Sequence, residues 1–198
     1  PTSSLIPITA GGYDRCQRWF NIEWRLMETD GFDVMTATQI IQSAGVNRST
    51  FYAHYADKYE LLNKQVDQLI GKLTDAAYRH APMTQEGSIA FAGGELQAYL
   101  TNIGAIFEQD AEKYQTILPE HAELLCSKFE GAAHAVWEKL GIIEMLTVPE
   151  RYVRAAVCGM ISSLIVEWLG SEGARAPEQF ADVSSNLIAP LAHAVTSG

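Results

Sequence analysis

Three helix starts follow one another within residues 36–62, and this crowding constrains the fold more than any other feature of the chain. Thr36 precedes Gln39 by three residues, the spacing of a capping box, in which the hydroxyl accepts from a backbone N–H and the amide reaches back. Asn47 is a favoured N-cap residue, and Asp57 precedes a glutamate by the same three residues. The segment is therefore predicted to hold short helices separated by sharp turns.

The first two of these helices are predicted to form a helix-turn-helix. Gly45 lies between them and supplies the positive φ that a sharp reversal needs. Val46 and Phe51 occupy the two positions of a hydrophobic staple, and Phe51 and Tyr55, four residues apart, share the side that packs on the core. In such a motif the second helix is laid in the major groove of DNA.

The outward side of the second helix, within residues 47–55, carries small, hydroxyl-bearing and aromatic side chains. Arg48 lies at its N-terminal end, where base edges are usually met, and a guanidinium can bind guanine bidentately. Ser49 or Thr50 could contact a base, a thymine methyl group or a phosphate, and the polar side chains that follow suit phosphates. The predicted DNA-binding residues are Thr36, Gln39, Asn47, Arg48, Ser49, Thr50, Tyr52, His54 and Lys58.

A formal charge of −10 is compatible with DNA binding because the acidity is unevenly distributed. Residues 1–80 carry 8 Lys and Arg against 9 Asp and Glu, whereas residues 81–198 carry 6 against 15. A locally neutral or basic face can therefore exist in the first part. Because residues 34–64 are only weakly basic, affinity should depend on a dimer making two sets of contacts and should fall steeply with salt.

Along the rest of the chain, apolar residues recur at helical spacing, which predicts an all-α fold. A first helix over residues 13–29 would place Cys16, Phe20, Trp24 and Met27 on one stripe. Further helices are predicted over residues 57–79, 95–107, 111–118, 120–140, 149–169 and 177–195.

Pro82, Gly87 and the Gly93-Gly94 pair interrupt the helical pattern and mark a domain boundary near residues 80–90. We place residues 1–80 in a helix-turn-helix domain that includes the linking long helix (57–80), and residues 81–198 in a larger helical domain. The longest apolar run, residues 155–169, contains a glutamate and is predicted to be a buried helix rather than a membrane span.

Catalytic and metal-binding motifs are not expected. His121-Ala122-Glu123 begins like a zinc deaminase signature, but the later Pro-Cys-x-x-Cys is missing, and no other catalytic fingerprint is present. The three cysteines are far apart, which suits reduced thiols in a cytoplasm, and we expect no signal peptide. No enzyme activity, cofactor or metal site is therefore predicted.

The pattern Phe32…Thr36…Ile40…Ala44-Gly45-Val46-Asn47-Arg48-Ser49-Thr50-Phe51-Tyr52-x-His54-Tyr55-x-Asp57-Lys58-x-x-Leu61-Leu62 closely resembles the DNA-binding domain of the tetracycline-repressor (TetR) family. The resemblance covers about residues 13–75. It implies a homodimeric all-α regulator in which three N-terminal helices bind DNA and a fourth links them to a body with a small-molecule pocket. It also implies that the last two long helices pair with their dyad mates in a four-helix bundle.

The C-terminal part resembles the DhaS-like branch of this family, which includes a coactivator of dihydroxyacetone kinase expression. The residues concerned are Pro149-Glu150, Gly159-Met160-Ile161, Glu167-Trp168-Leu169 and Pro177-Glu178-Gln179-Phe180. This branch allows activation through protein contact as an alternative to repression.

Residues of the body are assigned to two roles, with ordinary core packing as the alternative for each. An aromatic-rich body with a few polar anchors predicts an apolar ligand pocket. Its candidate residues are Tyr99, Phe107, Tyr114, His134, Trp137 and Met160. Small and apolar side chains of the last two helices predict a dimer seam, with candidates Ala155, Gly159, Ser162, Val166, Leu187 and Leu191.

The predicted function is a cytoplasmic, homodimeric, ligand-responsive repressor that binds double-stranded DNA at a palindromic operator and has no membrane partner. The effector is unidentified. The alternatives are a DhaS-like coactivator, an interaction module that does not bind DNA and, more distantly, a small-molecule enzyme.

Overall fold

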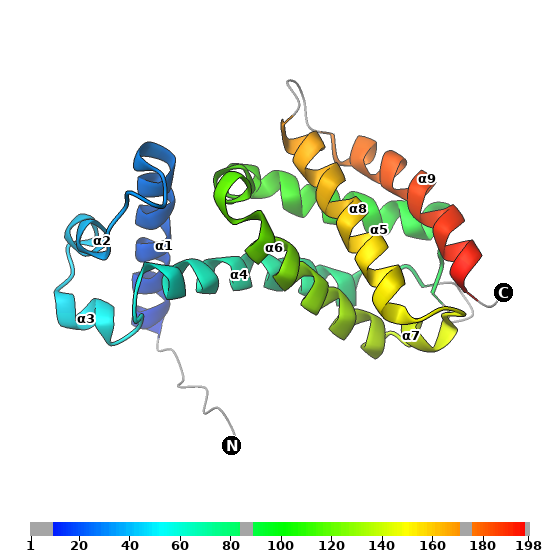
Figure 1. The fold of residues 1–198 in the computed structure, drawn as a ribbon, viewed down its shortest axis with the longest axis horizontal. Coiled ribbons are helices and arrows are strands. Elements are labelled where there is room, and N and C mark those ends of the chain that lie inside the picture. Colours follow the sequence, from blue (N-terminus) through cyan, green and yellow to red (C-terminus); the bar gives the residue numbers. More distant parts are fainter. Residues whose placement is uncertain (1–9, 84–88, 171–175, 197–198) are drawn as a thin grey trace, which may run out of the picture. The chain divides into compact units, whose positions relative to one another are not determined.

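The computed structural model describes residues 10–83, 89–170 and 176–196, without the side chains of residues 10–18 and 20 (Figure 1). Within these ranges the chain forms helices and two isolated bridges, Met83 with Ile89 and Leu146 with Thr196. The predicted all-α class is confirmed. The helices are α1 (Ala10–Asp30), α2 (Ala37–Ala44), α3 (Arg48–Tyr52), α4 (Lys58–Arg79), α5 (Gly93–Gln109), α6 (Ala111–Lys139), α7 (Ile142–Met145), α8 (Glu150–Gly170) and α9 (Pro177–Val195).

The chain divides into two compact units between Gln65 and Val66. We predicted the first domain to include the whole of the linking helix, but the division falls inside α4, which contributes its first residues to unit 1 and the rest to unit 2. A single helix is therefore the covalent connection between the units.

Unit 1 is built from α1, α2, α3 and the start of α4, with α1 packed on α2 and α2 on α3. Its core is aromatic and aliphatic. The largest fully buried side chains are Trp19, Phe32, Phe51, Met35 and Ile40. Of the stripe predicted on the first helix, Trp24 and Met27 are buried, whereas Cys16 and Phe20 lie outside the described side chains.

Unit 2 contains two main helix pairs, α5 with α9 and α6 with α8, and α8 also contacts α9. The approach of α5 to α9 is close at Gly104. A Cβ atom added there would lie 3.1 Å from the Phe180 ring and 3.2 Å from the carbonyl oxygen of Pro177. Because the nearer obstacles include backbone, only glycine fits this crossing without a shift.

The helices predicted over residues 111–118 and 120–140 form α6, which bends at His121. Pro119 explains the bend, since proline removes a helical hydrogen bond and clashes with the preceding turn. The backbone at His121 is non-helical, with φ −132° and ψ 28°. The short α7 was not predicted from the sequence.

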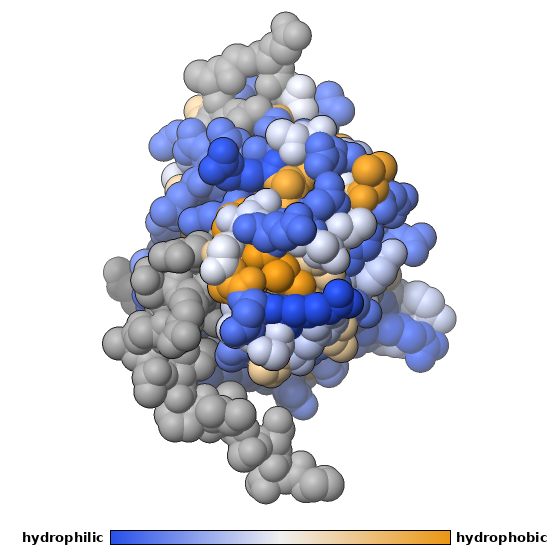
Figure 2. Space-filling model, turned by 90° about the vertical axis from the view of Figure 1, so that its left-hand side faces the viewer, coloured by the Kyte–Doolittle hydropathy of each residue, from blue (hydrophilic) through white to orange (hydrophobic). Residues whose placement is uncertain are grey.

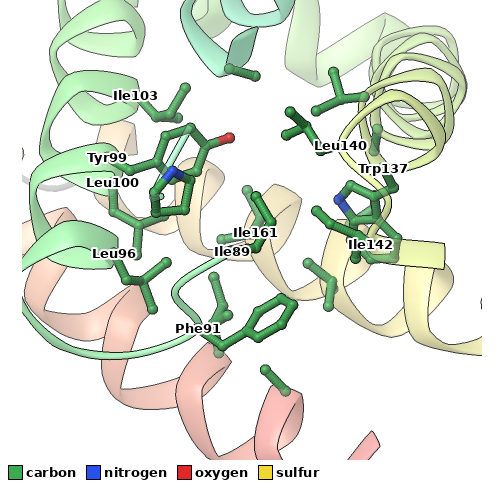
Figure 3. A pocket seen from close by; sticks show the side chains of 18 of the residues that line it. Ile89, Phe91, Leu96, Tyr99, Leu100, Ile103, Trp137, Leu140, Ile142 and Ile161 are labelled. Carbon is green, nitrogen blue, oxygen red and sulfur yellow. The ribbon is translucent and has the colours of Figure 1, made fainter. Parts of the chain in front are cut away.

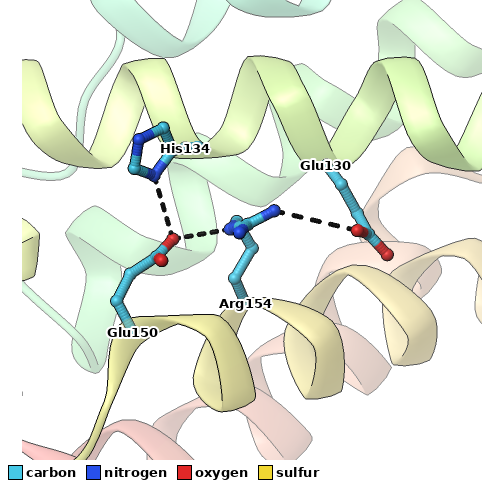
Figure 4. Close-up of polar contacts among 4 residues, drawn as sticks. All are labelled: Glu130, His134, Glu150 and Arg154. Carbon is cyan, nitrogen blue, oxygen red and sulfur yellow. Dashed lines mark hydrogen bonds and ion pairs between the residues drawn. The ribbon is translucent and has the colours of Figure 1, made fainter.

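A polar cluster ties α6 to α8 (Figure 4). Arg154 Nε donates to Glu150 Oε1 at 2.6 Å, and Arg154 Nη1 lies 3.7 Å from Glu130 Oε2. His134 Nδ1 lies 3.1 Å from the same Glu150 oxygen. The cluster therefore fixes how α8 begins against the second half of α6.

Candidate DNA interface and ligand cavity

The start of α2 is held by the capping box that the sequence predicted. Thr36 Oγ1 accepts from the Gln39 N–H at 3.2 Å, and Gln39 Oε1 accepts from the Thr36 N–H at 2.7 Å. The helix ends at Gly45, whose φ of 62° lies in the left-handed region. Both ends of α2 are therefore fixed by local sequence, which sets the direction in which the chain enters the turn.

The start of α3 depends on Asn47. Its Oδ1 accepts from the Thr50 N–H, the Ser49 hydroxyl and the Thr50 hydroxyl, each at 2.7 Å. This confirms the predicted N-cap. Both hydroxyls donate to the same oxygen, so each hydroxyl oxygen can still accept a hydrogen bond.

The outward face of α3 carries the side chains suited to base and phosphate contacts. Phe51 is fully buried beneath the helix and Tyr55 is buried after it, as expected, while Arg48, Ser49 and Tyr52 are exposed. The Arg48 guanidinium lies 5.4 Å from the centre of the Tyr52 ring, a cation–π distance that orders the arginine. Figure 2 faces the side where α2 and α3 lie and shows hydrophilic side chains surrounding a small apolar area.

Lys58 occupies a different environment from the one predicted for a phosphate contact. Its ammonium donates to the carbonyl oxygens of Phe32 at 2.7 Å, Met35 at 2.9 Å and Asp33 at 3.1 Å. An ammonium has three N–H donors, and all three are used. In this arrangement Lys58 stabilises the turn between α1 and α2, and no donor remains for a phosphate.

Two further residues at this end of unit 1 show how local contacts modify the predicted roles. The His54 side chain packs edge-on against Trp19, with ring centres 5.2 Å apart, although the residue remains exposed. Asp57 Oδ1 accepts from the Glu60 N–H at 2.8 Å, as expected of a cap. The reciprocal bond from Glu60 goes to the Ala56 N–H, one residue earlier than predicted.

A buried acid lies beneath this surface. The Glu23 side chain is fully buried and accepts a hydrogen bond from Gln65 Nε2 at its Oε2. Burial raises the pKa of Glu23 to about 9, against a smaller lowering effect of Lys58. Among the described residues, its Oε1 and the Gln65 Oε1 have no hydrogen-bond partner. A protonated carboxyl supplies the donor that these two oxygens lack, so Glu23 is neutral in the folded protein near pH 7.

Unit 2 contains an apolar cavity of about 180 Å³ (Figure 3). Its walls come from α4 to α9 and from the segment between α4 and α5, and none of the described lining residues is charged. Tyr99 and Trp137 turn their polar atoms toward the middle of the cavity. Burial raises the pKa of the Tyr99 hydroxyl to about 12, so this group stays a hydrogen-bond donor at neutral pH.

A second cavity of about 160 Å³ lies in the same unit, also without a charged residue among its described walls. The predicted pocket residues are shared between the two. Tyr99 and Trp137 line the first cavity, and Phe107 and Tyr114 line the second. His134 and Met160 line neither of these cavities, because His134 belongs to the polar cluster of α6 and α8 and Met160 lies half-buried on α8.

Helices α8 and α9 leave an apolar face exposed. Four of the six predicted dimer residues, Ala155, Gly159, Val166 and Leu187, are exposed on these helices. Ser162 and Val166 line the second cavity, and Leu191 lines the first. By length and composition alone α8 could cross a membrane, and 33% of its apolar segment is buried in the unit. The core helix of a soluble protein can meet the same criteria.

The arrangement is that of the helix-turn-helix class of proteins: a capped helix-turn-helix is joined by one helix to a larger helical unit, which contains an apolar cavity. Residues 24–64 match the family model described as "Bacterial regulatory proteins, tetR family". The match confirms, over these residues, the resemblance inferred from the sequence. A comparison with curated protein sequences gave no match.

Solved structures of TetR-family regulators share the fold of the chain. A TetR transcriptional regulator from Streptococcus agalactiae 2603V is 20% identical, with 89% of this chain and 94% of that chain covered and a TM-score of 0.63. The dihydroxyacetone kinase operon activator DhaS is 15% identical, with 92% and 98% covered and a TM-score of 0.60. Thermus thermophilus FadR, a repressor in complex with lauroyl-CoA, is 18% identical, with 87% and 92% covered and a TM-score of 0.51. At these identities the likeness shows the fold.

Proposed function

We propose that the chain is a ligand-responsive transcriptional repressor that binds a palindromic operator as a homodimer in the cytoplasm. The observation that carries this proposal is the surface of α3. Asn47 and Phe51 fix the helix from its two sides, so Arg48, Ser49 and Tyr52 face outward together. An arginine at the first turn of a recognition helix is placed to read guanine in the major groove, with Tyr52 and Ser49 suited to the neighbouring backbone.

Dimerisation through α8 and α9 is supported by the apolar surface that these helices expose. Tyr152 and Val166 on α8 have 61% and 48% of their surface exposed, and Leu187 on α9 has 46%. Large apolar residues left exposed on two helices that contact each other are typical of a protein interface. A second copy covering this face would bring together two helix-turn-helix units, here called reading heads, as a palindromic operator requires.

The first cavity is the proposed effector site. Leu73, Thr74 and Ala77 of α4 form part of its wall, and the same helix continues to Lys58 in unit 1. A ligand that favours one position of α4 would bias the spacing of the two reading heads, and only its differential affinity for the two arrangements can drive release. Because no described lining residue is charged, the effector is proposed to be uncharged where it is buried.

DNA binding is tested by selecting genomic fragments with the full-length chain and comparing three variants on the selected site. Arg48→Ala and Tyr52→Ala are expected to lower affinity at least about fivefold each, since a good base or backbone contact contributes about 1–3 kcal/mol. Arg25→Ala, which removes an exposed arginine from α1, is the matched control and should bind like the wild type. Failure to select a palindromic site, together with unchanged retention by both variants, would remove the DNA-binding proposal.

Activation is the second candidate function, because the activator DhaS is among the structures with this fold. Deleting the gene distinguishes repression from activation. Repression predicts that transcription of the neighbouring operon rises in the deletion strain, and activation predicts that it falls.

A further inference from the structure

The two cavities of unit 2 share two wall residues. Leu73 of α4 and Phe129 of α6 line both the first cavity and the second. The cavities are therefore separated by side chains rather than by backbone. Side chains change rotamers far more readily than helices move, so a partition of this kind can open when a ligand occupies it.

The chemistry of the combined walls selects one class of ligand. None of the described residues lining either cavity is charged, and burying an unpaired charge there would be costly. The Tyr99 hydroxyl and the Trp137 indole N–H both face the first cavity, and both are donors. An uncharged carbonyl or hydroxyl oxygen beside either group would find a donor, while the remaining wall suits hydrocarbon.

We propose that the two cavities form one elongated site for an unbranched, uncharged molecule with a single polar end. The polar end lies against Tyr99 or Trp137, and the hydrocarbon chain passes between Leu73 and Phe129 into the second cavity. This inference rests on the proposed function, since it takes the first cavity to be the effector site. It adds that chain length is the property by which the protein selects its effector.

A native thiol reports whether a ligand reaches the second cavity. Cys126 is half-buried and lines only the second of the two cavities. An alkyl chain that fills this cavity would shield the thiol from an alkylating reagent. Peptide mass spectrometry reads Cys126 separately from the other two cysteines, so the natural sequence can be used.

The experiment measures the affinity of the full-length chain for straight-chain methyl ketones from hexanone to tridecanone, and the rate of Cys126 alkylation by iodoacetamide with each. Affinity is expected to tighten about fourfold for every added methylene that becomes buried. Phe129→Trp enlarges a side chain that separates the two cavities. In this variant affinity should stop increasing at a shorter chain length than in the wild type. In the wild type the longer ketones should slow alkylation of Cys126, whereas in Phe129→Trp they should not.

A second variant guards against misfolding of the first. Ala122→Leu narrows the second cavity from a different position on α6 and should likewise shorten the preferred chain. Circular dichroism identifies variants that retain the helical fold. Equal preferred chain lengths in the wild type and both folded variants, with Cys126 unprotected, would overturn the inference while leaving the first cavity as effector site. Absence of binding by every ketone, short or long, would overturn both this inference and its premise that the first cavity binds an uncharged effector.

Discussion

Glu23→Gln is expected to change how the stability of the protein depends on pH. Glutamine has nearly the shape of a protonated glutamic acid, and its amide supplies the donor that the Glu23 and Gln65 oxygens lack. The variant therefore keeps the buried contact and removes the titration. The difference between the two proteins in how stability depends on pH therefore reports the proton held by Glu23.

The direction and size of the expected change in stability with pH follow from the linkage between proton binding and folding. The pKa of Glu23 rises from 4.5 to about 9 on folding, so between these values the folded chain holds a proton that the unfolded chain has lost. Wild-type stability from this group is fully present below pH 4.5 and is lost as the pH rises toward 9. One proton corresponds to a slope of about 1.4 kcal/mol per pH unit, or about 3 kcal/mol between pH 6 and pH 8.

The assay is urea denaturation followed by tryptophan fluorescence at several pH values between 6 and 8. The stability of Glu23→Gln relative to the wild type should increase with pH at close to this slope, since titrations common to both proteins cancel. Glu28→Gln, an exposed position on the same helix, is the control and should follow the wild type. If the stability of Glu23→Gln runs parallel to that of the wild type, Glu23 is not protonated in the fold and the reasoning is refuted.

Four further substitutions have expected outcomes. Gly104→Ala should destabilise the protein by about 1–3 kcal/mol by overpacking against Pro177, whereas Gly131→Ala, with open space at its Cβ, should stabilise it by about 0.5–1 kcal/mol; thermal denaturation compares the two. Asn47→Ala should cost about 1 kcal/mol through loss of the cap and weaken operator binding in a mobility-shift assay. Lys58→Met should lower the free energy of unfolding by about 1–3 kcal/mol, because the carbonyls that the ammonium binds lose their donor. The slope of log operator affinity against log salt concentration should change by less than the ~0.9 expected for one phosphate contact. A change of about one full unit in this slope would instead show that Lys58 contacts a phosphate.

The helix-turn-helix could be predicted almost residue by residue because its determinants are local. The caps at Thr36 and Asn47 and the positive φ at Gly45 depend on side chains within three residues of the backbone they bind. Such patterns are readable from the sequence alone. The bend in α6 was likewise predictable from Pro119.

Contacts between distant residues could not be predicted in the same way. Glu23 meets Gln65 across 42 positions, and an acid on an amphipathic helix is normally taken to face solvent. Lys58 was predicted to contact phosphate from its place at the start of the long helix. The carbonyls of residues 32–35 that surround its ammonium are brought there by the tertiary fold, so the sequence does not reveal them. The cavities were predicted only as a pocket in the body, since aromatic residues at helical spacing look the same in a filled core and in a cavity wall.

The most direct test of the proposed function is the affinity of the full-length chain for its selected operator with both half-sites intact and with one half-site scrambled, at one fixed salt concentration. Two reading heads held by a homodimer predict a loss of at least a hundredfold on scrambling, because several base contacts costing about 1–3 kcal/mol each are removed together. Equal affinity for the intact site, the half-scrambled site and unrelated DNA would contradict paired recognition through α3.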